Sequence, residues 1–81
     1  MTHDEVLDLV RAHLAEELEV EPEKISESTR FKEDLDADSL DLYELVMELE
    51  DRYRISVSEQ QAAKITTVGD AVAFVLEHAS A

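Results

Sequence analysis

Apolar residues recur at intervals of three and four along most of the chain, and this spacing limits the fold to packed helices. Such residues share one face of an α-helix, which has about 3.6 residues per turn. The clearest run near the N-terminus consists of Val6, Leu7, Val10, Leu14 and Leu18. The only β-branched alternation, at Ile55 and Val57, is too short to predict a strand. We therefore expect an all-α fold.

The chain is small, with 81 residues, one glycine, one proline and no cysteine. This composition predicts one domain over residues 1–81 that folds without disulfides or thiolate metal ligands. A domain of this size buries only roughly 60% of the surface that its unfolded chain exposes. Its hydrophobic residues, 44% of the chain, must therefore converge on a single core.

Acidic residues outnumber basic ones by 21 to 7, which gives a formal net charge of -14 at pH 7. A charge of this sign repels nucleic acid phosphates and anionic membranes, and it complements basic partners. No apolar run approaches the ~20 residues of a membrane span, and the N-terminal MTHDEVLDL lacks the basic start of a signal peptide. We expect a cytoplasmic monomer that binds neither nucleic acid nor membranes.

Capping residues divide the chain into three long helices and one short helix, the pattern of a small four-helix bundle. Ser, Thr or Asp can accept a hydrogen bond from the first helical turn, and an acidic or amide residue three positions later can complete a capping box. The helices expected in this way are 3–18 after Thr2, 39–53 after Asp38, a short segment through Lys64 after Ser58, and a last helix to Ala79 after Thr67.

A long loop joins the first two long helices between Val20 and Ala37. Pro22 and the Ser/Thr cluster at 26–29 interrupt the helical pattern there, and a short helical turn fits within the loop. Loops of this length are uncommon in compact domains and are usually functional. Its expected anchors to the core are Ile25, Phe31 and Leu35.

The helix 39–53 carries two apolar stripes on different sides. The stripe expected in the core contains Leu42, Leu45, Val46, Leu49 and Tyr53. The second contains Leu40, Tyr43 and Met47, roughly 130° away around the helix and among acidic residues. One helix cannot bury both stripes in so small a domain. The second stripe therefore either docks a partner that has an apolar pocket with a basic rim, or is ordinary exposed apolar surface.

The segment DLDADSLD places Ser39 at the start of this helix, among four aspartates. A nucleophilic serine needs an adjacent, oriented base, but the histidines lie at positions 3, 13 and 78. Negative neighbours also disfavour an alkoxide, and the chain has no GxSxG or SxxK pairing. We therefore expect that the protein is not an enzyme.

The same aspartates fail as a calcium-binding loop. Asp34, Asp36 and Asp38 match the first three ligand positions of an EF-hand. The position that needs glycine is Ser39, and the position that needs a bidentate glutamate is Leu45. We predict no metal site, leaving only weak, diffuse cation binding by these acids.

Two interpretations of the Ser39 hydroxyl remain open. Serine is common at helix starts, where it merely helps the helix to begin. Asp38 can already act as the cap, however, which leaves the hydroxyl free to project. A phosphate attached there would meet the unpaired N–H groups and the positive end of the helix dipole. Ser39 is therefore a candidate attachment point for a phosphate-linked group.

The segment DLDADSLDLYELVMELEDRY resembles the DLGADSLD-type segment of acyl carrier proteins, in which the serine of Asp-Ser-Leu bears 4'-phosphopantetheine. KITTVGDAVAFV is similar to the stretch that precedes and opens their final helix, and the resemblance covers essentially the whole chain. It implies that Ser39 carries this group, transferred from coenzyme A by a Mg²⁺-dependent phosphopantetheinyl transferase. Asp36 replaces the family's usual glycine, and aspartate tolerates left-handed backbone better than most residues.

The resemblance also implies a function and partners. Acyl chains would be held as thioesters on the arm and presented to enzymes of fatty acid synthesis: acyltransferase, ketosynthase, reductase and dehydratase, each with a basic docking patch. The residues that match the family's recognition helix are Asp38, Leu40, Asp41, Tyr43, Glu44, Met47, Glu48 and Asp51. A carrier of a polyketide or another specialised acyl pathway shares the pattern. An acidic helical adaptor without a prosthetic group is the alternative from a different class.

Overall fold

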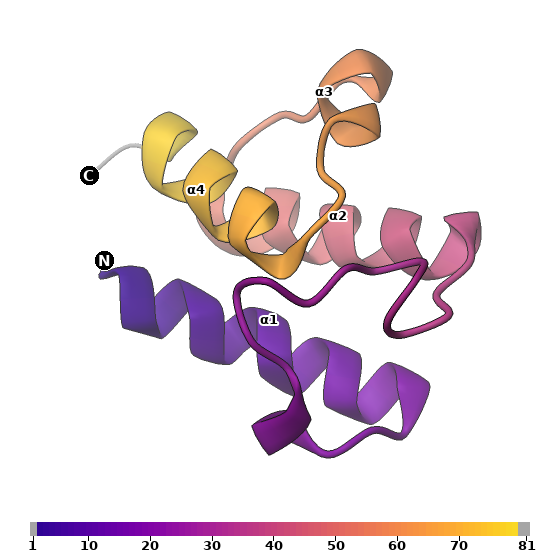
Figure 1. Cartoon of the computed structure of the whole chain (residues 1–81). Coiled ribbons are helices and arrows are strands. Elements are labelled where there is room, and N and C mark those ends of the chain that lie inside the picture. The colour runs from indigo at the N-terminus through magenta and orange to yellow at the C-terminus, as the bar shows by residue number, and fades with distance from the viewer. Residues whose placement is uncertain (1, 80–81) are drawn as a thin grey trace.

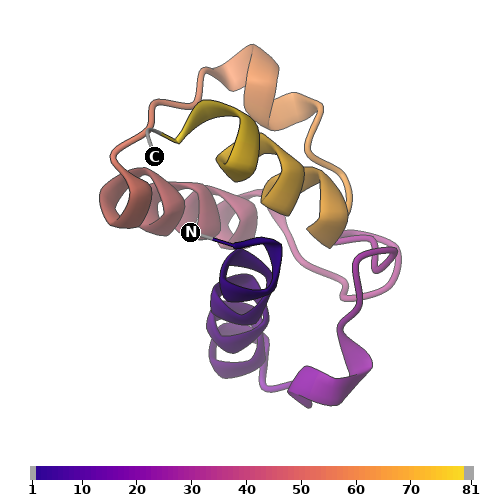
Figure 2. The ribbon, with the colours of Figure 1, turned by 90° about the vertical axis from the view of Figure 1, so that its left-hand side faces the viewer.

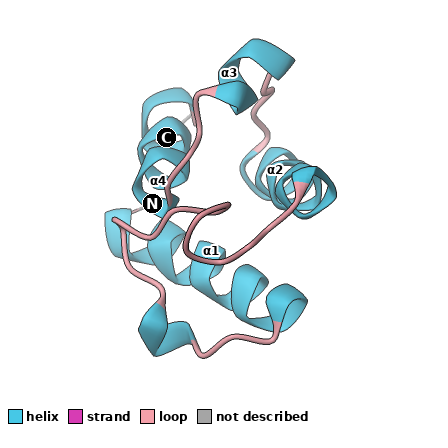
Figure 3. Cartoon of the chain, turned by 45° about the vertical axis from the view of Figure 1, so that its right-hand side comes forward, coloured by secondary structure: helices cyan, strands magenta, loops and turns pink. Residues whose placement is uncertain are grey.

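Three long helices enclose one apolar core in the computed structural model, which describes residues 2–79, and a fourth, short helix contributes no buried residue. Figure 1 shows three long helices and one short helix, and Figure 3 shows only helices and loops in this part of the chain. The all-α prediction is confirmed. None of these helices has the length and apolar content that a membrane span requires. The elements are α1 (His3–Leu18), a 3₁₀ turn η1 (Pro22–Lys24), α2 (Ser39–Tyr53), α3 (Glu59–Ala63) and α4 (Val68–His78).

Each helix begins at the cap that the sequence predicts. Thr2 Oγ1 accepts a hydrogen bond from the Glu5 N–H at 3.2 Å at the start of α1. The other three helices begin with complete capping boxes, after Asp38, Ser58 and Thr67. At α4, the Thr66 N–H, the Thr66 hydroxyl and the Thr67 N–H donate hydrogen bonds to the Asp70 carboxylate. These bonds hold the pKa of Asp70 below its ordinary value. Local hydrogen bonding therefore sets the helix boundaries.

The core lies where α1, α2 and α4 face one another, as Figure 2 shows from the side. From the loop, Ile25 and Phe31 enter it fully buried and Leu35 packs against it, so the predicted anchors are confirmed. On α2, Leu42 and Tyr53 are only half-buried, less than predicted, and Leu42 instead lines a cavity. The buried helical residues are Val6, Leu7, Val10, Leu14, Leu45, Val46, Leu49, Val68, Ala71, Val72 and Val75.

Backbone hydrogen bonds fasten the long loop to the start of α4. The Gly69 N–H donates to the Glu27 carbonyl at 2.8 Å, and the Val68 N–H donates to the Thr29 carbonyl at 2.9 Å. We call these two bonds, with that of Phe31 N–H to the Thr66 carbonyl at 3.1 Å, the loop–α4 pairing. The loop is therefore held against the start of α4 over residues 27–31.

Gly69 permits this close approach because it has no side chain. A Cβ at this position would lie 2.9 Å from the Glu27 carbonyl oxygen, which is too close for carbon and oxygen. We expect Gly69→Ala to lower the free energy of unfolding by about 1–3 kcal/mol through overpacking, although alanine ordinarily favours a helix by about 1 kcal/mol. Denaturant unfolding measures the change.

The control for this variant is Ala73→Gly on the exposed side of the same helix. It should lower the free energy of unfolding by no more than about 1 kcal/mol, the difference in helix propensity. If Gly69→Ala proves as stable as the original protein, the loop–α4 pairing does not limit the space at this position.

Asp36 adopts the left-handed conformation that its position in the sequence predicts, with φ 54°. This conformation is unfavourable by roughly 1–2 kcal/mol for a residue with a Cβ, less for aspartate than for most. We expect Asp36→Gly to raise the free energy of unfolding by about 1 kcal/mol and the Tm by roughly 4–8 °C. Asp36→Ala removes the same charge and keeps the Cβ, so its failure to stabilise would assign the gain to the backbone.

Candidate attachment site and docking face

Ser39 is the first residue of α2 and its side chain is exposed. The capping box on either side of it is complete: Asp38 Oδ1 accepts from the Asp41 N–H at 3.0 Å, and Asp41 Oδ2 accepts from the Asp38 N–H at 3.1 Å. Among the side-chain hydrogen bonds of residues 2–79, none uses the Ser39 hydroxyl. The cap is made entirely by the two aspartates, so the serine oxygen is available for reaction.

The N-terminal turn of α2 suits an attached phosphate. The first backbone N–H groups of a helix have no partner within it, and the helix dipole places partial positive charge there. The Asp41 N–H is taken by Asp38, so the N–H groups of Ser39 and Leu40 are the ones that remain for a phosphate on Ser39. The position thus offsets part of the negative charge that Asp38 and Asp41 bring.

A cavity of about 200 Å³ opens beside Ser39 and runs between α2 and α3 toward the core. Its wall is mostly apolar, with Leu42 and Val46 from α2, Ala62 from α3 and Ile65 from the following turn. An apolar cavity of ~150 Å³ is large enough to bind benzene. The space beside Ser39 can therefore accept the first part of an aliphatic chain.

The second apolar stripe of α2 faces solvent, as predicted. The exposed fractions are 64% for Leu40, 57% for Tyr43 and 55% for Met47. We call these three residues the docking strip. The acids around it are Glu44 and Asp51, both exposed, together with Glu48, which forms an ion pair with Arg52 at 3.3 Å. The surface is thus apolar at its centre and acidic at its edge.

An acidic cluster that sequence reasoning missed joins α1 to α2. Carboxylate oxygens of Glu17, Asp41 and Glu44 lie within 4.8 Å of one another, and His13 Nε2 lies 3.0 Å from a Glu17 carboxylate oxygen. Glu17 comes from a different helix, so no local spacing could have indicated it. Exposed acids often gather in this way without an ion, and the cluster adds negative charge beside the docking strip.

The loop that leads into α2 has its own ion pairs. Arg30 donates from its backbone N–H to Asp34 at 2.8 Å and from its guanidinium at 3.3 Å. The backbone hydrogen bond and the guanidinium hold the pKa of Asp34 below its ordinary value. Arg30 also lies 3.7 Å from Glu33. The positive charge of Arg30 is therefore engaged by the acids of its own turn.

Comparison with known proteins identifies the family. Residues 8–75 match the family model described as "Phosphopantetheine attachment site". The chain is also 42% identical to an acyl carrier protein of Rubrobacter xylanophilus over 81 residues, all of both chains. The chain belongs to the acyl carrier protein family. It is therefore a carrier and not an enzyme, and 4'-phosphopantetheine is the prosthetic group of its family.

Other acyl carrier proteins support the same assignment. The chain is 40% identical to one from Lactobacillus acidophilus, over 96% of this chain and 98% of that protein. It is 44% identical to one from Wolinella succinogenes, over 86% and 92% respectively. A solved structure of the acyl carrier protein from Enterococcus faecalis superposes with a TM-score of 0.84 at 35% identity, covering 98% of this chain and all of that one. The sequence resemblance and the four-helix fold are thus both confirmed.

The residues present fit the prosthetic group of the acyl carrier protein family. The group is attached through a phosphodiester, which requires an accessible hydroxyl with room around it. Ser39 offers an exposed hydroxyl that makes no hydrogen bond within residues 2–79, and the apolar cavity beside it could receive an attached chain. Members of the family work with synthase-type enzymes and with a phosphopantetheinyl transferase.

Proposed function

We propose that Ser39 carries 4'-phosphopantetheine and that the chain delivers acyl intermediates to the enzymes of fatty acid synthesis. The observation that carries this proposal is the position of the Ser39 hydroxyl, exposed at the start of α2 and at the edge of an apolar cavity. We propose residues 1–81 as one carrier domain in the cytoplasm; Met1, Ser80 and Ala81 lie outside the described residues.

Loading joins Ser39 to half of coenzyme A. The serine oxygen forms a bond to the phosphorus that bears pantetheine, and the bond between that phosphorus and the oxygen of 3',5'-ADP breaks. The serine proton passes to a base of the transferase, because the Ser39 hydroxyl forms no hydrogen bond to a base within residues 2–79 and the neighbouring aspartates are capping groups. When bound, the arm supplies a terminal thiol that holds an acyl chain as a thioester.

The chain's own residues would shelter and present the cargo. An acyl chain that enters the cavity between α2 and α3 leaves water and is stabilised by about 0.8 kcal/mol per buried methylene. Release to an enzyme then requires a pocket of similar apolar character. The cavity therefore protects the cargo between enzymes and yields it on docking.

We assign recognition to the docking strip and the acids around it. Leu40, Tyr43 and Met47 would fill an apolar pocket, while the acidic edge would meet Lys and Arg on the transferase, acyltransferase, ketosynthase, reductase or dehydratase. Asp38 and Asp41 have a second role as the cap of α2, so their replacement would alter the helix as well as the surface. Glu44 and Asp51 are exposed and form no ion pair within residues 2–79, so they test recognition more cleanly than Glu48, which pairs with Arg52.

The test of this function is the mass of the intact protein. Incubation with coenzyme A, Mg²⁺ and a broad-specificity transferase should add one phosphopantetheine, and the product should accept an acyl group at its thiol. A chain that stays unmodified would favour the acidic adaptor, which needs no prosthetic group. If protein purified from native cells carries exclusively polyketide-type acyl groups, the carrier belongs to a specialised pathway.

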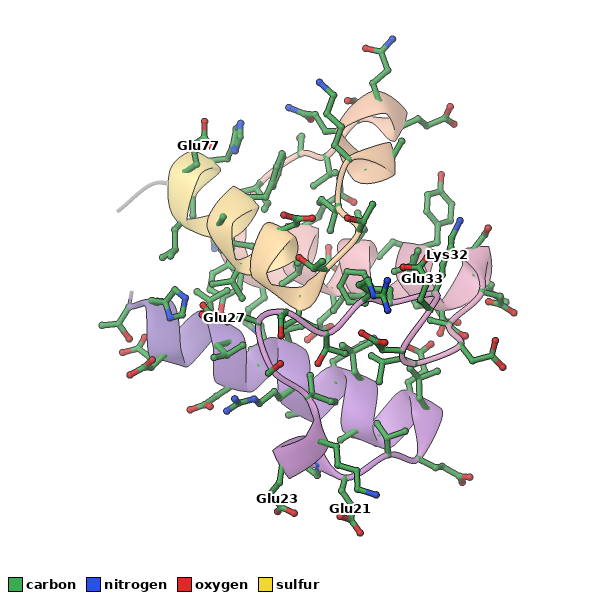
Figure 4. All side chains as sticks on the ribbon, in the orientation of Figure 1. Glu21, Glu23, Glu27, Lys32, Glu33 and Glu77 are labelled. Atoms are coloured by element: carbon green, nitrogen blue, oxygen red, sulfur yellow. The ribbon has the colours of Figure 1, made fainter. Side chains whose placement is uncertain are left out.

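A charge reversal tests the docking face. Glu44→Lys is expected to lower kcat/KM of the transferase for this substrate about tenfold, because a like charge would then face the basic patch of the enzyme. The control is Glu77→Lys, which makes the same change in net charge at an exposed residue near the C-terminal end of α4, outside the docking strip (Figure 4). Equal loss in both variants would show that net charge alone, and not this face, guides the encounter.

A further inference from the structure

We propose that Lys32 is a positioning residue for the prosthetic group. Its ammonium pairs with the phosphodiester, so that the arm lies across the mouth of the cavity. This inference rests on the proposed attachment at Ser39. It assigns a specific partner to the phosphate, where the helix start alone offers only backbone N–H groups. It concerns a residue of the long loop, outside the recognition helix.

Lys32 and Ser39 line the same cavity from two different segments. Figure 4 shows Lys32 on the loop beside the N-terminal turns of α2, with its side chain extending outward. The backbone that bears it is fixed, because the neighbouring Phe31 is fully buried and its carbonyl accepts from the Ala37 N–H at 2.9 Å. The flexible side chain of Lys32 therefore extends from fixed backbone at the wall of the cavity that Ser39 also lines.

The charge of Lys32 is available for a ligand. Within residues 2–79 it takes part in no ion pair, whereas Arg30 of the same loop is engaged by Asp34 at 3.3 Å and by Glu33 at 3.7 Å. The chain has two other lysines, Lys24 and Lys64, and neither lines the cavity beside Ser39. Lys32 is thus the lysine that a phosphate on Ser39 could reach.

A cation beside Ser39 would offset the negative charge that surrounds the attached phosphodiester. A phosphodiester adds one negative charge to a chain whose formal net charge is already -14, and it does so between Asp38 and Asp41. An ammonium is a compact charge that binds phosphate oxygens without demanding one geometry. Pairing on the cavity side of Ser39 would also direct the rest of the arm over the apolar opening and away from solvent.

The three lysines provide an internally controlled experiment. In protein with isotope-labelled lysine, the side-chain NMR signals of Lys24, Lys32 and Lys64 are compared before and after loading with phosphopantetheine. The signal of Lys32 should shift on loading, and those of Lys24 and Lys64 should not. High salt should reduce the shift, since an exposed pair is screened within ~10 Å at 0.1 M.

Variants separate charge from size. The phosphorus NMR relaxation of the loaded protein reports how long the phosphodiester is held. In Lys32→Ala, the fraction of loaded protein whose phosphodiester is held at the surface should fall about twofold to fivefold, the range that an exposed ion pair supports. Lys32→Arg should retain this fraction. Both variants should melt like the original protein, because Lys32 is exposed and makes no ion pair within the described residues.

Two outcomes would overturn the proposal, and they are distinguishable. If Ser39 loads but the Lys32 signal stays in place and Lys32→Ala relaxes like the original protein, the positioning role is wrong and the carrier function stands. If mass spectrometry shows that Ser39 cannot be loaded at all, the proposed attachment fails and the role of Lys32 fails with it.

Discussion

Ser39→Ala is expected to abolish loading completely, with no detectable gain of phosphopantetheine under conditions that fully modify the original protein. The reaction needs an oxygen nucleophile at this position, and alanine has none. Stability should change by less than ~0.5 kcal/mol, because the residue is exposed and the cap of α2 is made by Asp38 and Asp41. Intact mass measures the first effect and thermal unfolding the second.

The matched control is Ser56→Ala, an exposed serine in the connection between α2 and α3. It should be loaded at the same rate as the original protein. A full mass gain in Ser39→Ala would place the arm on another hydroxyl and refute the proposed site. Loss of loading together with loss of fold would instead indicate that the serine supports α2, which its lack of hydrogen bonds within residues 2–79 argues against.

Octanoyl loading is expected to raise the Tm of the carrier above that of the unacylated loaded form. Burial of the six methylenes and the terminal methyl of the octanoyl chain would contribute up to about 5–6 kcal/mol, comparable with the total stability of about 5–15 kcal/mol that small domains have. Even a gain of about 2 kcal/mol would raise the Tm by roughly 8–16 °C in a chain of this size. Calorimetry of the two forms measures the difference.

Filling the cavity should remove this gain. Ala62 lines the space between α2 and α3, and Ala62→Phe would occupy it with a ring. The octanoyl form of that variant should melt close to its unacylated form, whereas Ala73→Phe on the exposed side of α4 should keep the full increment. Equal Tm values for the octanoyl and the unacylated loaded forms of the original protein would mean that the acyl chain stays in solvent.

The helix starts were predictable because each depends on residues three positions apart. Asp38 and Ser58 each form the capping hydrogen bonds that their local sequences indicate, and α2 and α3 begin directly after them. The left-handed backbone at Asp36 could also be anticipated, since it stands where a related segment has glycine. Local chemistry therefore accounts for the helix starts and for the turn before α2.

The remaining features depend on contacts between distant segments. The loop–α4 pairing joins residues 27–31 to 66–69, and no short-range signal indicates it. Likewise, the cavity needs Ala62 of α3 opposite Val46 of α2, and Lys32 gains its place near Ser39 only through the packing of Phe31. The serine itself was identifiable from sequence, but its apolar neighbourhood was not.

The outer wall of the cavity, α3, has little apolar contact with the core. α3 has five residues, none of them buried, and its own capping box at Ser58 holds it together as a unit. An element with so little apolar contact can shift or open locally at small cost in free energy, while α1, α2 and α4 keep the core closed. The α3 wall of the cavity can therefore move more easily than the other walls. We expect a longer acyl chain to be accommodated by outward displacement of α3 and not by rearrangement of the core.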